Sequence, residues 1–141
     1  MQTISVVIVN YNGLSVLVNC LRTLELSQQY IHEIIIVDNG STDGSKTYLE
    51  GYLDTHATAR VIWNTYNNGF AGANNQGAAV ATGAYLLFLN NDTLLTKLFL
   101  PKMVRSLEKN SLCAAVQPLI LFPDMTIDSV GSYLTPTGFL Y

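Results

Sequence analysis

Four groups of asparagine and aspartate residues are the parts of this sequence best suited to chemistry. They are residues 10–12, 38–39, 64–68 and 90–92, and each directly follows a short apolar run. Amides and carboxylates hydrogen-bond hydroxyl groups and ring nitrogens, and carboxylates also bind hard divalent cations. If the apolar runs are neighbouring parallel strands, the four groups meet at one edge of a sheet, because ligands of open α/β sheets bind outside the carboxyl ends of the strands.

Two carboxylates in these groups suggest specific roles. Asp38 closes an apolar run, where it can accept hydrogen bonds from a ribose hydroxyl or a base nitrogen; a plain turn before a helix is the alternative. Asp92 follows another run and can serve Mg²⁺ or Mn²⁺ when phosphate oxygens and water complete the coordination, unless it only ends a strand. Residues 67–75 fit either anion binding by backbone N–H groups or a turn capped by asparagine. Tyr11 fits equally well as a stacking or as a packing residue.

The hydrophobic pattern predicts the elements that would position these groups. Short apolar runs, β-branched in the first two, predict strands over residues 4–10, 33–38, 60–64, 84–89 and, interrupted by Pro118, 113–122. Helical spacing of apolar residues predicts helices over residues 14–26, 44–53, 70–82 and 96–110. This alternation predicts an α/β fold with a mostly parallel sheet flanked by helices. Residues 124–141 read as the start of a hairpin or loop that lacks its partner.

Composition narrows the function classes. The 141 residues predict one domain, and the net charge of −3 with seven scattered Lys and Arg argues against a nucleic-acid partner. Only 12% of the residues are charged, so exposed apolar surface can favour self-association. Cys20 and Cys113 read as two buried thiols in a reducing compartment. We expect a cytoplasmic protein, with peripheral membrane contact only through a lipid-linked acceptor.

Taken in order, four motifs resemble the amino-terminal half of a family 2 glycosyltransferase of the GT-A fold, in its rhamnosyltransferase-like branch. The motifs are SVVIVNYN at 5–12, VDNGSTDGS at 37–45, NNGFAGANN at 67–75 and GAYLLFLNND at 83–92. This resemblance implies a sheet of the GT-A type, truncated here after its fifth strand. It also implies that residues 1–141 are the nucleotide-sugar-binding part, with 124–141 beginning an incomplete acceptor-side region.

The resemblance implies a pocket for a nucleotide-diphosphate sugar, transferred with inversion to a saccharide or lipid-linked acceptor in cell-surface polysaccharide biosynthesis. Asp92 matches the last acid of the family's D-x-D element, which binds a Mg²⁺ or Mn²⁺ ion that bridges the diphosphate. The positions matching the family's donor nucleotide site are Asn10, Tyr11, Asn12, Asp38, Asn68, Gly69, Asn74, Asn90 and Asn91.

Two departures from the family pattern bear on activity. The first acid of the D-x-D element is Asn90 here, which should loosen the hold on a metal. The family's general base lies downstream of that element, and neither Asp124 nor Asp128 stands in a similar motif. We therefore assign no catalytic residue and expect this chain alone to transfer sugar poorly or not at all. A non-catalytic nucleotide-binding module is the main alternative, and a flavodoxin-like binding protein a more distant one.

Overall fold

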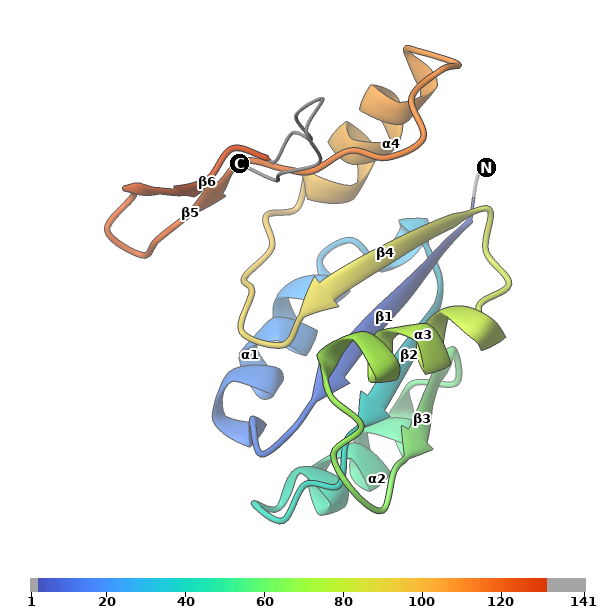
Figure 1. Ribbon diagram of the computed structural model, residues 1–141, viewed down its shortest axis with the longest axis vertical. Coiled ribbons are helices and arrows are strands. Elements are labelled where there is room, and N and C mark those ends of the chain that lie inside the picture. Colours follow the sequence, from blue (N-terminus) through green and yellow to red (C-terminus); the bar gives the residue numbers. More distant parts are fainter. Residues whose placement is uncertain (1–2, 132–141) are drawn as a thin grey trace, which may run out of the picture. The chain divides into compact units, whose positions relative to one another are not determined.

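The main sheet is parallel and has four strands in the order β3-β2-β1-β4 (Figure 1). The computed structural model describes residues 3–131, and the chain forms two compact units, Met1–Leu98 and Phe99–Tyr141. The whole sheet belongs to the first unit. Its strands are β1 (Ile4–Asn10), β2 (Ile31–Asp38), β3 (Ala59–Trp63) and β4 (Tyr85–Asn90).

The central strands β1 and β2 are buried because their β-branched residues fill both faces of the sheet. The register pairs Ile8 with Ile36 on one side and with Leu89 on the other. At the carboxyl end it pairs Asn10 with Asp38. Because every pairing in this sheet is parallel, the polar residues that end β1, β2 and β4 and the Asn64 that follows β3 share one edge.

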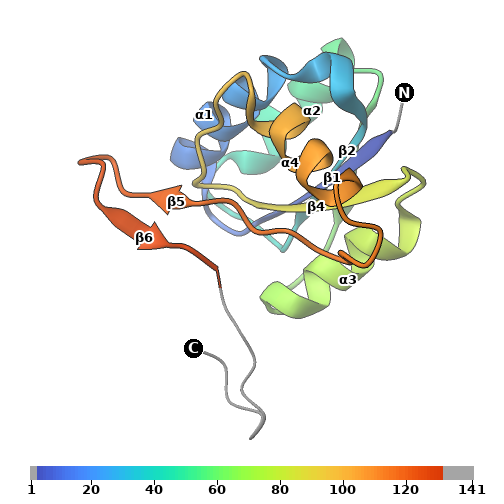
Figure 2. The ribbon, with the colours of Figure 1, turned by 90° about the horizontal axis from the view of Figure 1, so that it is seen from above.

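Helices cover both faces of the sheet. Figure 2 shows α1 (Leu14–Glu25) and α2 (Ser45–Thr55) on one face and α3 (Phe70–Val80) on the other. A short 3-10 helix, Gln28–Tyr30, leads into β2. Helix α3 packs closely on the sheet at Gly77, where a Cβ atom would overlap the side chain of Val7. The elements expected in this unit are all present, with ends within about two residues of those predicted.

A charged network closes the amino end of the sheet. Ser5 Oγ, Thr82 N and Thr82 Oγ1 each donate to Glu33 Oε1 at 2.7 Å, and Arg60 pairs with Glu33 Oε2 at 2.6 Å. Burial opposes ionisation of Glu33, but these hydrogen bonds and Arg60 outweigh it and lower its pKa from 4.5 to about 2. The network therefore ties together β1, β2, β3 and the segment before β4.

The second unit corrects the expected fifth strand. It contains α4 (Phe99–Glu108) and an antiparallel ribbon of β5 (Ile120–Leu121) and β6 (Ile127–Ser129). Residues 113–119 form no strand, and Pro118 accounts for part of this because it has no N–H to donate. The sheet therefore has four parallel strands rather than five, and the hairpin after residue 122 finds its partner in β5.

Two smaller expectations also meet the structure. Cys20 is buried, but Cys113 is partly exposed, so the prediction of two buried thiols was wrong for the second. Residues 132–141, in the region expected to begin an acceptor side, lie outside the described residues. Within residues 3–131, no helix is both long and apolar enough to cross a membrane.

Candidate functional site

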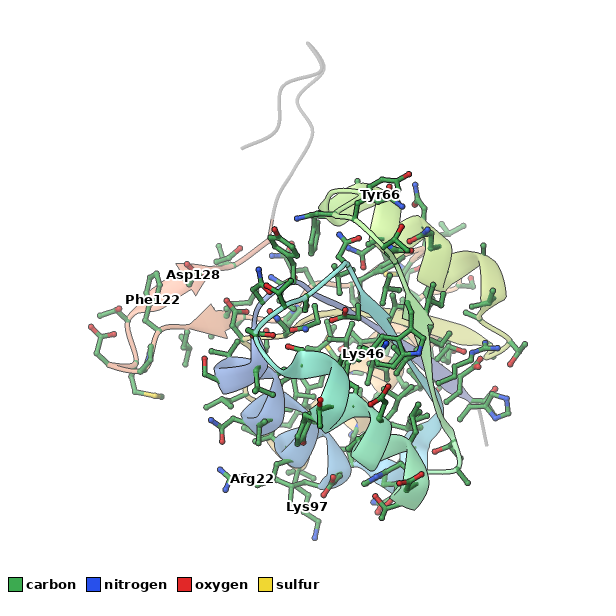
Figure 3. The ribbon with its side chains drawn as sticks, turned by 90° about the horizontal axis from the view of Figure 1, so that it is seen from below. Arg22, Lys46, Tyr66, Lys97, Phe122 and Asp128 are labelled. Atoms are coloured by element: carbon green, nitrogen blue, oxygen red, sulfur yellow. The ribbon has the colours of Figure 1, made fainter. Side chains whose placement is uncertain are left out.

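A cleft of about 320 Å³ opens at the carboxyl end of the sheet. Its wall comes from the ends of β1, β2 and β4 and from the start of α3, through Val9, Tyr11, Asn39, Asn67, Phe70, Asn90, Asn91 and Asp92. Among these lining residues Asp92 is charged, and none is Lys or Arg. Figure 3 shows Arg22 and Lys97 projecting on the side of α1, away from Tyr66 near the start of α3.

Side-chain hydrogen bonds connect the Asn and Asp groups at this edge. Asn91 Nδ2 donates to Asn10 Oδ1 at 2.9 Å, and Asn10 Nδ2 donates to Asp38 Oδ1 at 3.1 Å. Asn39 Nδ2 donates to Asn67 Oδ1 at 2.8 Å. The expectation that the four groups meet at one edge of the sheet is thereby confirmed, while the binding role of each residue stays a prediction.

Asn10 links the ends of β4 and β2 from inside the protein. The residue is fully buried, and its Nδ2 also donates to Ser41 Oγ at 3.2 Å. Gly13 makes room for this link, because a Cβ there would overlap Asn91 Nδ2 and lie 2.9 Å from Asn10 Oδ1. Asp38 is 3% exposed, and its second oxygen accepts the Ser41 N–H at 3.0 Å. Asn10 thus holds Asn91 and Asp38 in fixed relation.

The loops after β1 and β2 are braced against each other. Asn12 has a positive φ of 50°, and its Oδ1 accepts the Thr42 N–H at 2.7 Å. Asp43 accepts the N–H of Leu14 at 2.8 Å and that of Ser45 at 3.1 Å, the first residues of α1 and α2. The hydrogen bond from the Ser45 hydroxyl is the main cause that lowers the pKa of Asp43. Asp43 therefore caps the first turns of two helices.

The start of α3 is held by asparagine side chains. Asn68 N donates to Asn39 Oδ1 at 3.0 Å, and Gly69 N donates to Asn67 Oδ1 at 2.8 Å. Asn74 Nδ2 donates to the carbonyl of Phe70, one turn back in the same helix. Asparagine side chains thus occupy the N–H groups of Asn68 and Gly69. The arrangement there is a capped turn and not an open anion site.

The cleft separates the predicted site residues into two sets. Tyr11, Asn90, Asn91 and Asp92 line it. The remaining predicted residues lie beside or behind its wall, and these are Asn10, Asn12, Asp38, Asn68, Gly69 and Asn74.

Four lining residues were not among the predicted ones: Val9, Asn39, Asn67 and Phe70. Asn39 and Asn67 stand next to the predicted Asp38 and Asn68, in groups that the sequence had singled out. Two adjacent polar residues look alike in a sequence, and only the side-chain directions in the folded chain tell which one faces the cleft. Phe70 had no signal beyond its place in the motif at 67–75.

The side-chain oxygens at the end of β4 suit a hard divalent cation as ligands. Asp92 and Asn90 are both exposed at the cleft, and oxygen ligands suit Mg²⁺ and Mn²⁺. The Cys20 thiol lies close by and donates to the Asn90 carbonyl at 3.5 Å. Burial and the nearby Asp92 charge raise the pKa of this thiol to about 12, so it stays protonated and is no metal ligand. Residues 3–131 contain no group of three or more His, Cys, Asp or Glu placed to hold a metal. A cation would therefore need further ligands from phosphate and water.

Comparison with known proteins gives relatives and folds for this arrangement. The chain is 36% identical to glycosyltransferase GlyG of Streptococcus pneumoniae over 95 residues, 67% of this chain and 31% of that protein. It is 37% identical over 92 residues to poly(ribitol-phosphate) beta-glucosyltransferase of Bacillus spizizenii, covering 63% of this chain and 14% of that protein. The chain thus spans about a third or less of the length of these curated relatives.

A solved structure supports the same fold. Mannosyltransferase PcManGT from Pyrobaculum calidifontis, in complex with GDP-Man and Mn²⁺, superposes with a TM-score of 0.68 at 24% identity, covering 74% of this chain and 32% of that one. The parallel sheet flanked by helices is the GT-A fold of such glycosyltransferases. The sequence model of the family described as Glycosyl transferase family 2 matches residues 5–132. This chain belongs to glycosyl transferase family 2.

Proposed function

We propose that this chain is the donor-binding part of a glycosyltransferase that uses a nucleotide-diphosphate sugar. The observation that carries the proposal is the cleft at the carboxyl end of the sheet, where amides, two aromatic rings and one exposed carboxylate converge. This is where ligands of open α/β sheets bind. Family membership and the nucleotide-sugar complex of PcManGT support the same ligand class.

Each part of the cleft suits one part of such a donor. Tyr11 is 51% exposed and can stack on the base or sugar. Asp38 stays the proposed base contact, through the lone pairs that its hydrogen bonds from Asn10 and Ser41 leave free. Asn90 and Asn91 can bind sugar or ribose hydroxyls. Asp92 would hold Mg²⁺ or Mn²⁺, with Asn90 beside it. When bound, such a cation supplies Lewis-acid stabilisation of the charge that grows on the leaving diphosphate.

The charge of the cleft makes nucleotide binding depend on the cation. The lining contains Asp92 and no basic side chain, so a diphosphate would meet net negative charge there. Coulomb repulsion at a partly enclosed site costs several kcal/mol at short distance. We therefore expect nucleotide and divalent cation to bind together, each strengthening the other.

The finer assignments follow the family. We propose transfer with inversion, which rests on the family resemblance alone, to a saccharide or lipid-linked acceptor in cell-surface polysaccharide biosynthesis. The relative named poly(ribitol-phosphate) beta-glucosyltransferase supports a polymer acceptor. No general base is assigned. Asp124 accepts hydrogen bonds from Thr126 N and Thr126 Oγ1 at 3.0 and 2.6 Å, which lower its pKa and give it a turn-closing role.

Calorimetry with UDP, dTDP and GDP, each with and without Mn²⁺, tests the proposal. Measurable binding in the presence of Mn²⁺ and its loss without the ion support the proposal. Replacing the carboxylate in Asp92→Asn should weaken Mn²⁺-dependent binding by about 10- to 100-fold, as loss of a metal ligand or its support does. The exposed Asp54→Asn on α2 is the matched control and should bind as the unmodified chain does.

A hydrolysis assay with the corresponding sugar nucleotides then separates enzyme from binding module. Turnover that disappears in Asp92→Asn supports the transferase, and binding without turnover supports the non-catalytic module. Failure of all three nucleotides to bind with Mn²⁺ would contradict the proposed function.

A further inference from the structure

The side chain of Asn39 uses all of its hydrogen-bonding capacity inside the protein. The residue directly follows β2 and is 1% exposed. Its Nδ2 donates to Asn67 Oδ1 at 2.8 Å and to the Gly69 carbonyl at 3.3 Å. Its Oδ1 accepts from Asn64 Nδ2 and from Asn68 N, both at 3.0 Å. An amide offers two donor hydrogens and two acceptor lone pairs, so the side chain is saturated.

Asn64 is itself held from α3. Asn64 Nδ2 donates to Gln76 Oε1 at 2.7 Å, and Gln76 Nε2 donates back to Asn64 Oδ1 at 3.2 Å. The backbone N–H of Asn64 donates to the Asp38 carbonyl at 2.9 Å. A continuous row of amides thus runs from Gln76 through Asn64 to Asn39, joining α3, the end of β3 and the end of β2.

We propose that Asn39 is a positioning residue that holds residues 64–69 and the start of α3 as one wall of the donor cleft, with Asn64 and Gln76 as its support. Asn67 and Phe70 are the lining residues of that wall. Gly69 between them has φ 75°, a conformation that favours glycine. The inference rests on the proposed function and adds residues that fix the site without needing to touch the nucleotide.

The physical gain is pre-organisation. A segment of six residues that is ordered only on binding would cost conformational entropy at that moment, and this cost would subtract from affinity. Asn39 orders the segment beforehand. It does so with neutral amides, which add no negative charge beside a diphosphate.

A carboxylate at position 39 separates this role from simple packing. Aspartate has nearly the shape of asparagine and can still accept from Asn64 and Asn68. It cannot donate, so its oxygen would face the oxygens of Asn67 and Gly69. Asn67 Oδ1 would then turn away, and the Gly69 N–H would lose its acceptor.

The test uses Asn39→Asp and Gln76→Leu, with Asn19→Asp and Gln29→Leu as matched controls on exposed positions. Calorimetry measures binding of UDP and GDP with Mn²⁺, and NMR measures hydrogen exchange of the Gly69 N–H without nucleotide. We expect Asn39→Asp to weaken binding by about 10- to 100-fold and Gln76→Leu by a smaller factor, with faster Gly69 exchange in both. The controls should match the unmodified chain.

Three results overturn the inference. Equal nucleotide affinity in Asn39→Asp and the unmodified chain would show that Asn39 positions nothing that the ligand needs. Unchanged Gly69 exchange in both variants would show that the amide row does not hold the wall. If the unmodified chain binds neither UDP nor GDP with Mn²⁺, the proposed function fails and the inference falls with it. Should Asn39→Asp fail to fold, Gln76→Leu decides the matter by the same two readouts.

Discussion

The two ends of the same parallel sheet carry opposite kinds of polar network. At the amino end, Glu33 is ionised and 12% exposed, and protein donors from Ser5, Thr82 and Arg60 surround it. At the carboxyl end, neutral amides bond to one another and to the buried Asp38, and Asp92 is exposed among the residues that line the cleft. A charge satisfied within the chain serves stability, whereas a charge left open beside satisfied amides is available to a ligand.

A glycine lies close to each polar network of the sheet, and the atoms that each glycine leaves room for are different. A Cβ at Gly83 would lie 2.7 Å from Ser5 N and Ser5 Oγ, next to the Glu33 network. A Cβ at Gly13 would overlap the tip of the Asn91 side chain, at the cleft. Backbone at the amino end cannot move aside, whereas a side-chain tip at the carboxyl end can.

The largest expected effect is on stability at the amino end. Glu33→Gln keeps an acceptor for Ser5 and Thr82 but sets an amide against Arg60, so the free energy of unfolding should fall by about 2–3 kcal/mol. Urea denaturation measures this, with the exposed Glu50→Gln as control. A loss in Glu33→Gln no larger than in the control would mean that the network contributes nothing to stability.

Acid should remove the same contribution. The folded-state pKa of Glu33 is about 2 and its ordinary value is 4.5, so its stabilisation is complete above pH 4.5 and is lost as pH falls towards 2. The difference in unfolding free energy between the unmodified chain and Glu33→Gln should therefore be constant from pH 5 to 7 and shrink between pH 4.5 and 2. A difference that grows in acid would contradict the assigned charge state.

Gly83→Ala extends the comparison to the backbone. The added methyl group would press on Ser5 N, and we expect a loss of about 2 kcal/mol in stability with unchanged nucleotide affinity of the folded protein. Gly51→Ala on α2 is the control, because a Cβ there meets nothing within 4 Å. That variant should gain about 0.5–1 kcal/mol from helix propensity. Comparable losses in both variants would remove the steric explanation.

Gly13→Ala, at the carboxyl end of the sheet, should cause the smallest loss of stability among these variants. The methyl group displaces Asn91 from Asn10, so we expect about tenfold weaker nucleotide binding with Mn²⁺ and about 1 kcal/mol of lost stability. Calorimetry and urea denaturation on the same sample give both numbers. Full affinity in this variant would separate the Asn10 to Asn91 contact from ligand binding.

The first unit could be predicted well from the sequence because its signals are local and agree with one another. The runs at 4–10 and 33–38 are β-branched, the following helices have clear apolar stripes, and parallel pairing then brings the strand ends together. The prediction of a fifth strand over residues 113–122 was wrong because its signals do not agree with one another. Residues 113–119 are apolar enough for a strand, but Pro118 has no N–H to donate, and within residues 3–131 no strand pairs with this stretch.

The location of the site could be predicted from the sequence better than the individual residues that line it. Groups of Asn and Asp marked the cleft, yet Asn10 and Asp38 are buried and do not line it, whereas Asn67 is exposed and does. Hydrogen bonds between residues 25 or more positions apart decide which side chain faces outward, and no local pattern records them. The Glu33 network escaped notice for the same reason.

The central claim is that one end of the sheet stabilises the fold and the other binds the donor. Paired calorimetry and urea denaturation of Asp92→Asn and Glu33→Gln, with UDP or GDP and Mn²⁺, test it most directly. The account predicts that Asp92→Asn loses about 10- to 100-fold in affinity at unchanged stability, and that Glu33→Gln loses stability at unchanged affinity. Parallel losses of affinity and stability in both variants would contradict it.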